Sequence, residues 1–193
     1  MRKRTLAAGA LAAGALAVGV LSSTRAGKRA DSKAFRAVNR GHGPVADRFF
    51  ASVTELGSLY ASSAAAGALV LSGERRAGTR GMMAAGAMWA VGQALKQTFG
   101  RPRPFDAYLE DEFRLMIARP QGTSWPSSHP AVLLAFLTAA TAELELPPRQ
   151  RVAVSSVALA VGASRTYLGV HYPSDVVGGL MLGAAVGTAL SPP

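Results

Sequence analysis

Long apolar stretches, separated by shorter charged segments, dominate the chain. Six of them can be followed: residues 5–24, about 49–73, 81–95, 130 to Glu143, 152 to Arg165, and 176–193. No strand-like alternation of apolar and polar positions is sustained, and there is no internal repeat. The pattern therefore predicts an all-α protein, a bundle of about six helices.

The length of the stretches favours a membrane protein. A spanning helix needs roughly 20 mainly apolar residues, and residues 5–24, 49–73 and 176–193 are long enough. The shorter stretches can span only if their polar ends reach the interface or line an internal site. Because Ala and Gly, which are abundant here, let helices pack closely in lipid, we expect a multi-pass protein of the cell membrane. A soluble or singly anchored helical bundle is the alternative.

The N-terminal part divides into two segments. Residues 1–24 join the basic start "RKR" to an uncharged apolar run, which predicts a transmembrane span or signal anchor. A cleaved signal peptide is the alternative, although such peptides have apolar cores of only about 7–15 residues. Residues 25–48 form a basic juxtamembrane segment, and residues 49–193 form the helical-bundle domain.

The basic segment 25–48 complicates the topology. An N-terminus inside the cell places "GERRAGTRG" and "PPRQR" on the cytoplasmic side, as the positive-inside rule prefers. The same orientation puts residues 25–48 outside, against that rule. An amphipathic helix lying on the membrane surface would explain the conflict, and so would a cleaved or inverted first span.

Charge and composition narrow the function classes. The formal net charge is +10, from 21 Lys and Arg against 11 Asp and Glu, and there is no Cys. Thiolate metal sites and cysteine nucleophiles are therefore excluded. The basic residues gather between apolar stretches and are not interleaved with aromatic residues, so the chain lacks the pattern of a nucleic-acid-binding module. An anionic membrane surface or an anionic substrate fits better.

Polar clusters stand at the ends of the apolar stretches. "KQTFGRPRP" closes the third stretch, "WPSSHP" opens the fourth, and "SRTYLGVHYPSD" joins the fifth to the sixth. Their candidate functional residues are Lys96, Arg103, Ser127, Ser128, His129, Arg165, His171 and Asp175. In an up-down bundle these helix ends fall on one side. We therefore expect all three clusters to meet at one end of the bundle.

Such a meeting would assemble a phosphate site. Lys96, Arg103 and Arg165 would converge with only Asp175 as a matching acid, and Arg side chains bind phosphate oxygens bidentately. The run from Pro126 to Pro130 has the residues of a helix start. A helix N-terminus offers free backbone N–H groups to an anion.

The two histidines and the aspartate would supply the reaction. An imidazole can attack phosphorus and form a covalent intermediate. Asp175 follows His171 by four residues, so it can orient that ring if the turn between them is helical. His129, beside the Ser hydroxyls, is the candidate general acid. Arg101 lies between Lys96 and Arg103 in the first cluster, and for Arg101 as for Arg103 a role as an interfacial anchor only is the alternative. Trp125 lines the substrate entrance or lies at the membrane interface.

Together the clusters resemble the signature of the type 2 phosphatidic acid phosphatase and vanadium haloperoxidase superfamily. Its first motif, a Lys, six residues and Arg-Pro, is matched by Lys96, Arg103 and Pro104. Its second, Pro-Ser-Gly-His, is matched by Pro126, Ser127 and His129, with Ser128 in place of Gly. Its third is matched by Ser164, Arg165, His171 and Asp175. The motif region covers about 80 residues, and the six-stretch layout extends the resemblance over most of the chain.

The resemblance implies a phosphohistidine mechanism without a metal or other cofactor. Lys96, Arg103 and Arg165 would hold the phosphoryl oxygens, and Ser127 with the amides near Ser128 would complete the cradle. His171 would be the nucleophile, Asp175 its partner and His129 the acid. A serine at 128 keeps the backbone amide, so it is tolerable if the family's Gly is not needed for an unusual backbone conformation.

The expected function is hydrolysis of a lipid phosphomonoester or pyrophosphate, with phosphatidate, phosphatidylglycerol phosphate and polyprenyl phosphate or diphosphate as candidates. A vanadate-dependent haloperoxidase is one alternative, because vanadate fits the same cradle. A membrane protein that binds anionic lipid without turnover is another. The partner is thus a lipid phosphate and not nucleic acid, and no oligomeric state is predicted.

Overall fold

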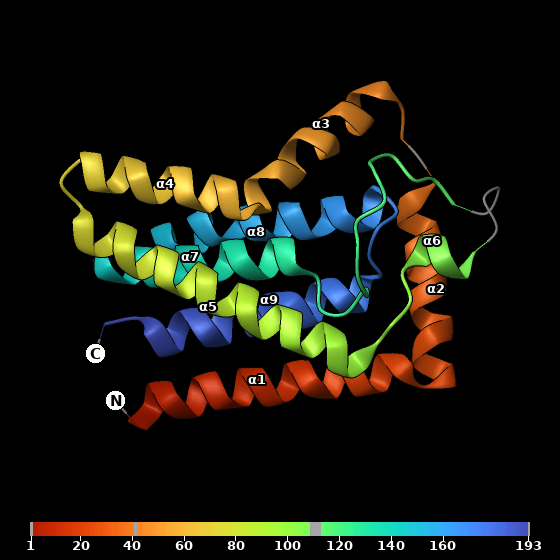
Figure 1. Cartoon of the computed structure of the whole chain (residues 1–193), viewed down its shortest axis with the longest axis horizontal. Coiled ribbons are helices and arrows are strands. Elements are labelled where there is room, and N and C mark those ends of the chain that lie inside the picture. The colour runs from red at the N-terminus through yellow and green to blue at the C-terminus, as the bar shows by residue number, and fades with distance from the viewer. Residues whose placement is uncertain (1, 41, 109–112, 193) are drawn as a thin grey trace.

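The computed structural model describes residues 2–40, 42–108 and 113–192, and all regular structure in these ranges is helical (Figure 1). The α-helices are α1 Arg2–Ser23, α2 Arg25–Asn39, α3 Pro44–Thr54, α4 Leu59–Leu71, α5 Arg75–Phe99, α6 Pro104–Ala107, α7 Ser128–Glu143, α8 Pro148–Tyr167 and α9 Pro173–Leu190. A 3₁₀ turn, η1 Glu55–Gly57, joins α3 to α4. The predicted all-α fold is confirmed.

The bundle is built around α7. This helix packs against α5, α8 and α9, while α1 lies along α9, and the long helices run side by side in Figure 1. Most buried side chains of α7 are small or apolar, and Met88, Phe136 and Leu182 fill the core between helices. The bundle thus uses alanine-rich faces that bring its helices close together.

Helices α7 and α9 approach each other closely. A Cβ added at Gly179 would lie 2.4 Å from the carbonyl oxygen of Ser127, and one at Gly183 would lie 2.3 Å from that of Ala131. Gly187 follows four residues later and meets α7 in the same way. The spacing of four residues puts all three glycines on one face of α9, the small-residue pattern of closely packed membrane helices.

The second apolar stretch does not form one long helix. It divides into α3, η1 and α4, and α3 diverges from the bundle in Figure 1. The break has a local cause, because Ser58 caps α4 by accepting a hydrogen bond from Ala61 N at 3.1 Å. Among the described helices, α1 and α9 are long and apolar enough to cross a membrane, and α4 is apolar but shorter. The expectation that residues 49–73 form a full-length span is therefore wrong.

Helix α2 lies across one end of the bundle (Figure 1). Its buried side chains are Asp31, Phe35 and Asn39, spaced four residues apart on one face. The Phe35 ring stacks on Tyr108 with centroids 5.5 Å apart. The Asn39 amide donates to the carbonyl oxygen of Tyr167 at 2.7 Å. Basic side chains occupy the exposed face of α2, so the segment is amphipathic and is attached to the bundle by its buried stripe.

Candidate active site

The three polar clusters meet at the end of the bundle that α2 covers. The site lies where α5 and α8 end and where α7 and α9 begin, as the up-down arrangement predicts (Figure 1). Helix ends and hydrogen bonds place the predicted residues at this end of the bundle.

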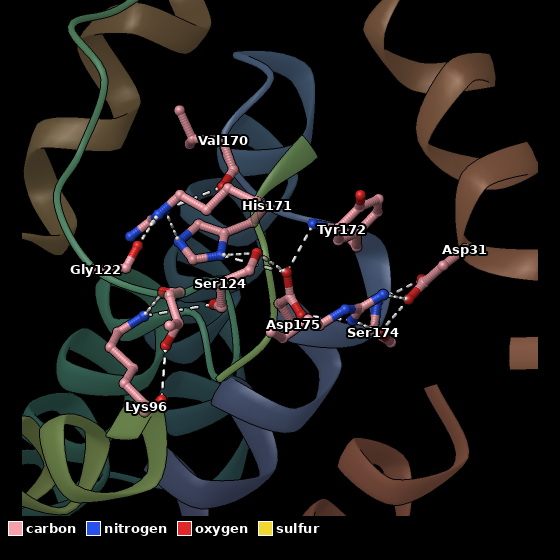
Figure 2. Close-up of polar contacts among 12 residues, drawn as sticks. Asp31, Lys96, Gly122, Ser124, Val170, His171, Tyr172, Ser174 and Asp175 are labelled. Atoms are coloured by element: carbon pink, nitrogen blue, oxygen red, sulfur yellow. Dashed lines mark hydrogen bonds and ion pairs between the residues drawn. The ribbon is translucent and has the colours of Figure 1, made fainter. Parts of the chain in front are cut away.

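The first cluster follows from how α5 ends. Gly100 adopts a left-handed conformation with φ +56°, and its N–H donates to the Lys96 carbonyl oxygen at 3.1 Å. Lys96 therefore stands in the last turn, with its Nζ donating to the Thr123 carbonyl oxygen at 2.7 Å. The Thr123 hydroxyl donates back to the Lys96 carbonyl oxygen at 2.8 Å. These contacts join α5 to the loop that leads into α7 (Figure 2).

Arg103 is held by the same loop and by the third cluster. Its Nε donates to the Gly122 carbonyl oxygen at 2.8 Å and its Nη1 to that of Val170 at 3.0 Å. Nη1 also lies 3.2 Å from His171 Nε2. Because a guanidinium can only donate, Nε2 is the unprotonated nitrogen of the ring, and the proton of neutral His171 resides on Nδ1.

The other side of the His171 ring faces Asp175 and Ser124 (Figure 2). Nδ1 lies 3.5 Å from Asp175 Oδ2 and 3.4 Å from Ser124 Oγ. The Ser124 hydroxyl donates to the same Asp175 oxygen at 2.5 Å. An ionised acceptor thus stands on the protonated side of the imidazole, while the lone pair of Nε2 points to the cationic side.

The sequence "YPSD" explains why Asp175 takes this position. Pro173 is the first residue of α9 and Asp175 the third, and the Asp175 carboxylate accepts the Tyr172 N–H at 2.9 Å. This is one half of a capping box, which fixes a side chain at the third helical position. Capping the helix and orienting His171 are therefore done by one carboxylate.

The surroundings of His171 keep it neutral. Burial lowers the pKa of His171 well below its usual value, and the positive charges of Arg103, Lys96 and Arg165 lower it further. Burial likewise lowers the pKa of Arg103, although the Asp175 carboxylate opposes this. His171 is consequently an unprotonated base at neutral pH, and the lone pair of its Nε2 accepts a hydrogen bond from Arg103.

Three polar atoms of the predicted cradle are buried and have no hydrogen-bond partner within the described part of the chain. They are Ser127 Oγ, Ser128 Oγ and Arg165 Nε. Arg165 is otherwise fixed by its Nη1, which donates to Thr54 Oγ1 at 2.8 Å. Buried polar groups are nearly always paired, so the unpaired atoms of these three cradle residues leave hydrogen-bonding capacity for a polar ligand.

His129 lies in the first turn of α7. The α7 start agrees with the predicted helix start, although the Ser127 hydroxyl makes no capping bond. Gly57 of η1 approaches closely, since a Cβ there would lie 2.7 Å from His129 Cβ. Arg165, Arg103 and Lys96 are all near enough to act on His129 electrostatically. The structure thus brings together all the residues predicted from the three clusters.

Ser128 occupies the motif position of the family's Gly without strain. Among the described non-glycine residues only Glu145 has a positive φ, so Ser128 has an ordinary helical backbone. A glycine is therefore not required here for conformation, and the amide is presented by serine equally well.

Two expectations for other residues are wrong. Arg101 is no interfacial anchor, because it is buried and forms ion pairs of 2.6 Å with both Asp31 and Asp175. Trp125 lines no entrance and lies at no interface. It is fully buried, with its ring 4.0 Å from that of Phe99.

Sequence reasoning missed the roles of Ser124 and Asp31. Ser124 lies only a few residues before the second motif, and Asp31 is an isolated acid in a basic segment. Nothing in their local sequence links either of them to Asp175.

The residues in the ranges 2–40, 42–108 and 113–192 contain no group of three or more His, Asp or Glu that could hold a metal ion.

Comparison with known proteins gives a consistent result. The model of the PAP2 superfamily matches residues 79–192. Lipid A 1-phosphatase of Rhizobium johnstonii is 39% identical over 92 residues, which is 47% of this chain and 36% of that protein. The Rhizobium etli protein of the same name is 38% identical over 91 residues, 46% of this chain and 38% of that protein. The match thus spans little more than a third of these curated relatives.

Two solved structures resemble the whole fold. A transmembrane PAP2-type phosphatidylglycerolphosphate phosphatase from Bacillus subtilis has a TM-score of 0.76 at 21% identity, covering 95% of this chain and 93% of that one. Aquifex aeolicus LpxE has a TM-score of 0.68 at 26% identity, covering 81% and 91%. The architecture is therefore that of membrane phosphatases of this type.

Proposed function

Because the chain belongs to the PAP2 superfamily, we propose that it is a multi-pass cell-membrane phosphatase that hydrolyses a lipid phosphate through a phosphohistidine intermediate. One observation carries the proposal. Three buried, unpaired polar atoms of Ser127, Ser128 and Arg165 belong to the same cluster as a neutral histidine whose lone pair faces cations. That combination fits an anion that is bound and then attacked.

In the first step Nε2 of His171 attacks phosphorus, and the bond from phosphorus to the leaving oxygen breaks. Lys96, Arg103 and Arg165 bind the phosphoryl oxygens, whose charge they balance as the transition state forms. His129 enters this step protonated, a form that the negative charge of the bound phosphate favours, and gives its proton to the leaving oxygen. The Nδ1 proton stays on the ring, where Asp175 stabilises the positive charge that develops on it.

In the second step water attacks the phosphohistidine. His129 now accepts a proton from that water, the bond from nitrogen to phosphorus breaks, and inorganic phosphate leaves. His171 returns to its neutral form with Nε2 unprotonated. Neither step needs a redox change or an additional co-reactant, and both histidines end as they began.

The substrate class follows from the position of the site at the end of an apolar bundle. A lipid whose tail lies in the bilayer presents its head group at this level. The relatives act, by their names, on lipid A 1-phosphate and on phosphatidylglycerolphosphate. We therefore include both lipids, with phosphatidate and polyprenyl diphosphate, as the first substrates to assay.

The nucleophile is tested by His171→Ala in detergent-solubilised protein. Phosphate release should fall by roughly 10⁴-fold and covalent labelling from radioactive lipid phosphate should disappear. Asp175→Asn should lower both by on the order of 10²-fold or more, because the imidazole loses its charged partner. The readouts are released phosphate and acid-labile protein-bound label.

His42→Ala is the matched control. His42 precedes α3 and stacks on Tyr167 at 5.8 Å between ring centroids. It is none of the candidate functional residues, so its removal should leave turnover unchanged. Full turnover in His171→Ala would refute the nucleophile. Release of phosphate only from soluble esters would refute the lipid substrate, and lipid binding without any release by the wild-type protein would refute the enzyme.

A further inference from the structure

A chain of buried contacts runs from α2 to the candidate active site (Figure 2). Asp31 Oδ2 pairs with Arg101 Nη2 at 2.6 Å, and Arg101 Nη1 pairs with Asp175 Oδ1 at 2.6 Å. Asp31 also accepts hydrogen bonds from the backbone N–H of Ser174, at 3.0 Å, and from its hydroxyl. The Asp31 carboxylate of α2 therefore binds both Arg101, which pairs with Asp175, and Ser174, the residue before Asp175.

The arrangement around Arg101 is buried and closely packed. All of its contacts with Asp31 and Asp175 are buried, and its guanidinium lies 4.2 Å from the centre of the Tyr172 ring. Phe35, one turn after Asp31 on α2, packs against the same Tyr172 ring at 5.7 Å between centroids. Helix α2 is thereby fixed over the network.

Charge explains what Asp31 adds. Arg101 alone would neutralise Asp175, and the pair would offer His171 no net negative charge. With Asp31 the three groups carry a net charge of −1. Although burial alone would lower the pKa of Arg101, the carboxylates of Asp175 and Asp31 raise it, so the cation remains charged between the two acids.

We propose that Asp31 is a positioning residue for this reaction: it balances the charge of Arg101, so that the group of Asp31, Arg101 and Asp175 presents a net negative charge to His171. The proposal rests on the function proposed above. Asp31 lies outside the family match of residues 79–192, so it adds to the phosphatase site a component from a helix that precedes that region.

The effect should be visible in the ionisation of His171, whose charged surroundings are known on every side. Arg103 faces it from the loop after α5, Lys96 from α5, His129 from α7 and Arg165 from α8. Asp175 faces it from α9, and Arg101 with Asp31 stands behind Asp175. Removing one negative charge from this set makes protonation of His171 harder.

The test is the pH profile of phosphate release by Asp31→Asn, which keeps the shape and the acceptor oxygen but loses the charge. We expect kcat about 10-fold lower with little change in KM. The acid limb of the profile should move to lower pH by about half a unit. A purely structural defect would lower the amount of active protein without moving the limb.

A double-mutant cycle of charge-removing substitutions makes the test specific. Arg101→Gln alone should move the acid limb to higher pH, because it removes a cation. Asp31→Asn combined with Arg101→Gln restores the net charge of −1 and should return the limb to its wild-type position. Asp31→Glu, which retains the charge, should hold the limb in place even if the longer side chain lowers kcat.

Asp47→Asn is the matched control. Asp47 pairs with Arg114 at 3.2 Å and accepts a hydrogen bond from Tyr167 at the same end of the bundle, but it has no contact with Arg101. Its limb should coincide with that of the wild type. The role of Asp31 would be overturned if the acid limb of Asp31→Asn coincided with that of the wild type. It would also be overturned if the acid limb of the double variant did not return to the wild-type position. A wild-type protein that releases no phosphate would instead overturn the proposed function.

Discussion

At the scale of single residues, the site depends on groups that have two tasks. Asp175 caps α9 and also faces His171 Nδ1. Arg103 fixes two loop carbonyl groups and also donates to His171 Nε2. Hydrogen bonds hold both groups in position before any substrate arrives, and the contact of Arg103 with Nε2 is exchanged for phosphorus when that nitrogen attacks.

Ser128 offers a test of the amide at the start of α7. Ser128→Gly keeps the amide on an unstrained backbone and loses only the hydroxyl, so release should fall by roughly 5-fold, which is what one hydrogen bond is worth. Ser128→Pro fits the first position of a helix but lacks the N–H, so release should fall by on the order of 10²-fold. Steady-state kinetics on the best lipid substrate measures both. Equal activity of the two variants would show that this amide has no role.

At the scale of elements, close helix contact places the clusters. The α7 and α9 starts are linked directly, since Ser127 N–H donates to the Asp175 carbonyl oxygen at 3.0 Å. That bond requires the near approach of backbones that Gly179 and Gly183 permit. The spacing of His171 from the cradle is thus set by glycines on a neighbouring helix.

Gly183→Ala tests that packing. Its Cβ would lie 2.3 Å from the Ala131 carbonyl oxygen, so the helices must separate at a cost of about 1–3 kcal/mol. The apparent melting temperature in detergent should drop by roughly 2–12 °C. Gly86→Ala is the same chemical change at a position with nothing within 4 Å, and it should be neutral or slightly stabilising. Equal melting temperatures for both variants would contradict this account.

At the scale of the whole molecule, several helices of the bundle expose large apolar side chains. The exposed large side chains include Leu71 of α4, Met83 and Trp89 of α5, and Val152 and Leu159 of α8. Several helices other than α1 thus present apolar groups outward, as helices in lipid do. Charged side chains gather instead at the two ends.

The distribution predicts that the bundle itself is embedded in the membrane. A protease site placed between Arg40 and Pro44 would separate α1 and α2 from the remainder. After cleavage and an alkaline carbonate wash, the fragment containing α3 to α9 should stay in the membrane pellet, as shown by immunoblotting. Its release into the supernatant would indicate a soluble bundle with a single anchor.

Much of the site could be predicted because its residues lie in short sequence motifs at the ends of apolar stretches. The apolar stretches predicted the helices, and the residues at their ends predicted which groups would meet. Lys96, His129 and His171 could be recognised since the spacing within each motif is set by one helix end or turn. The break at Ser58, by contrast, was missed, because an apolar stretch hides a capping residue.

The sequence by itself determined the helical fold, the end of the bundle that carries the site, and the cationic and histidine groups there. Only the tertiary structure decided how Asp175 is shared among His171, Ser124 and Arg101, and that Asp31 balances the charge of Arg101. The reason is physical. Helix periodicity and capping act over a few residues, whereas an ion pair between residues 31 and 101 depends on how α2 packs across the bundle, which no local pattern encodes.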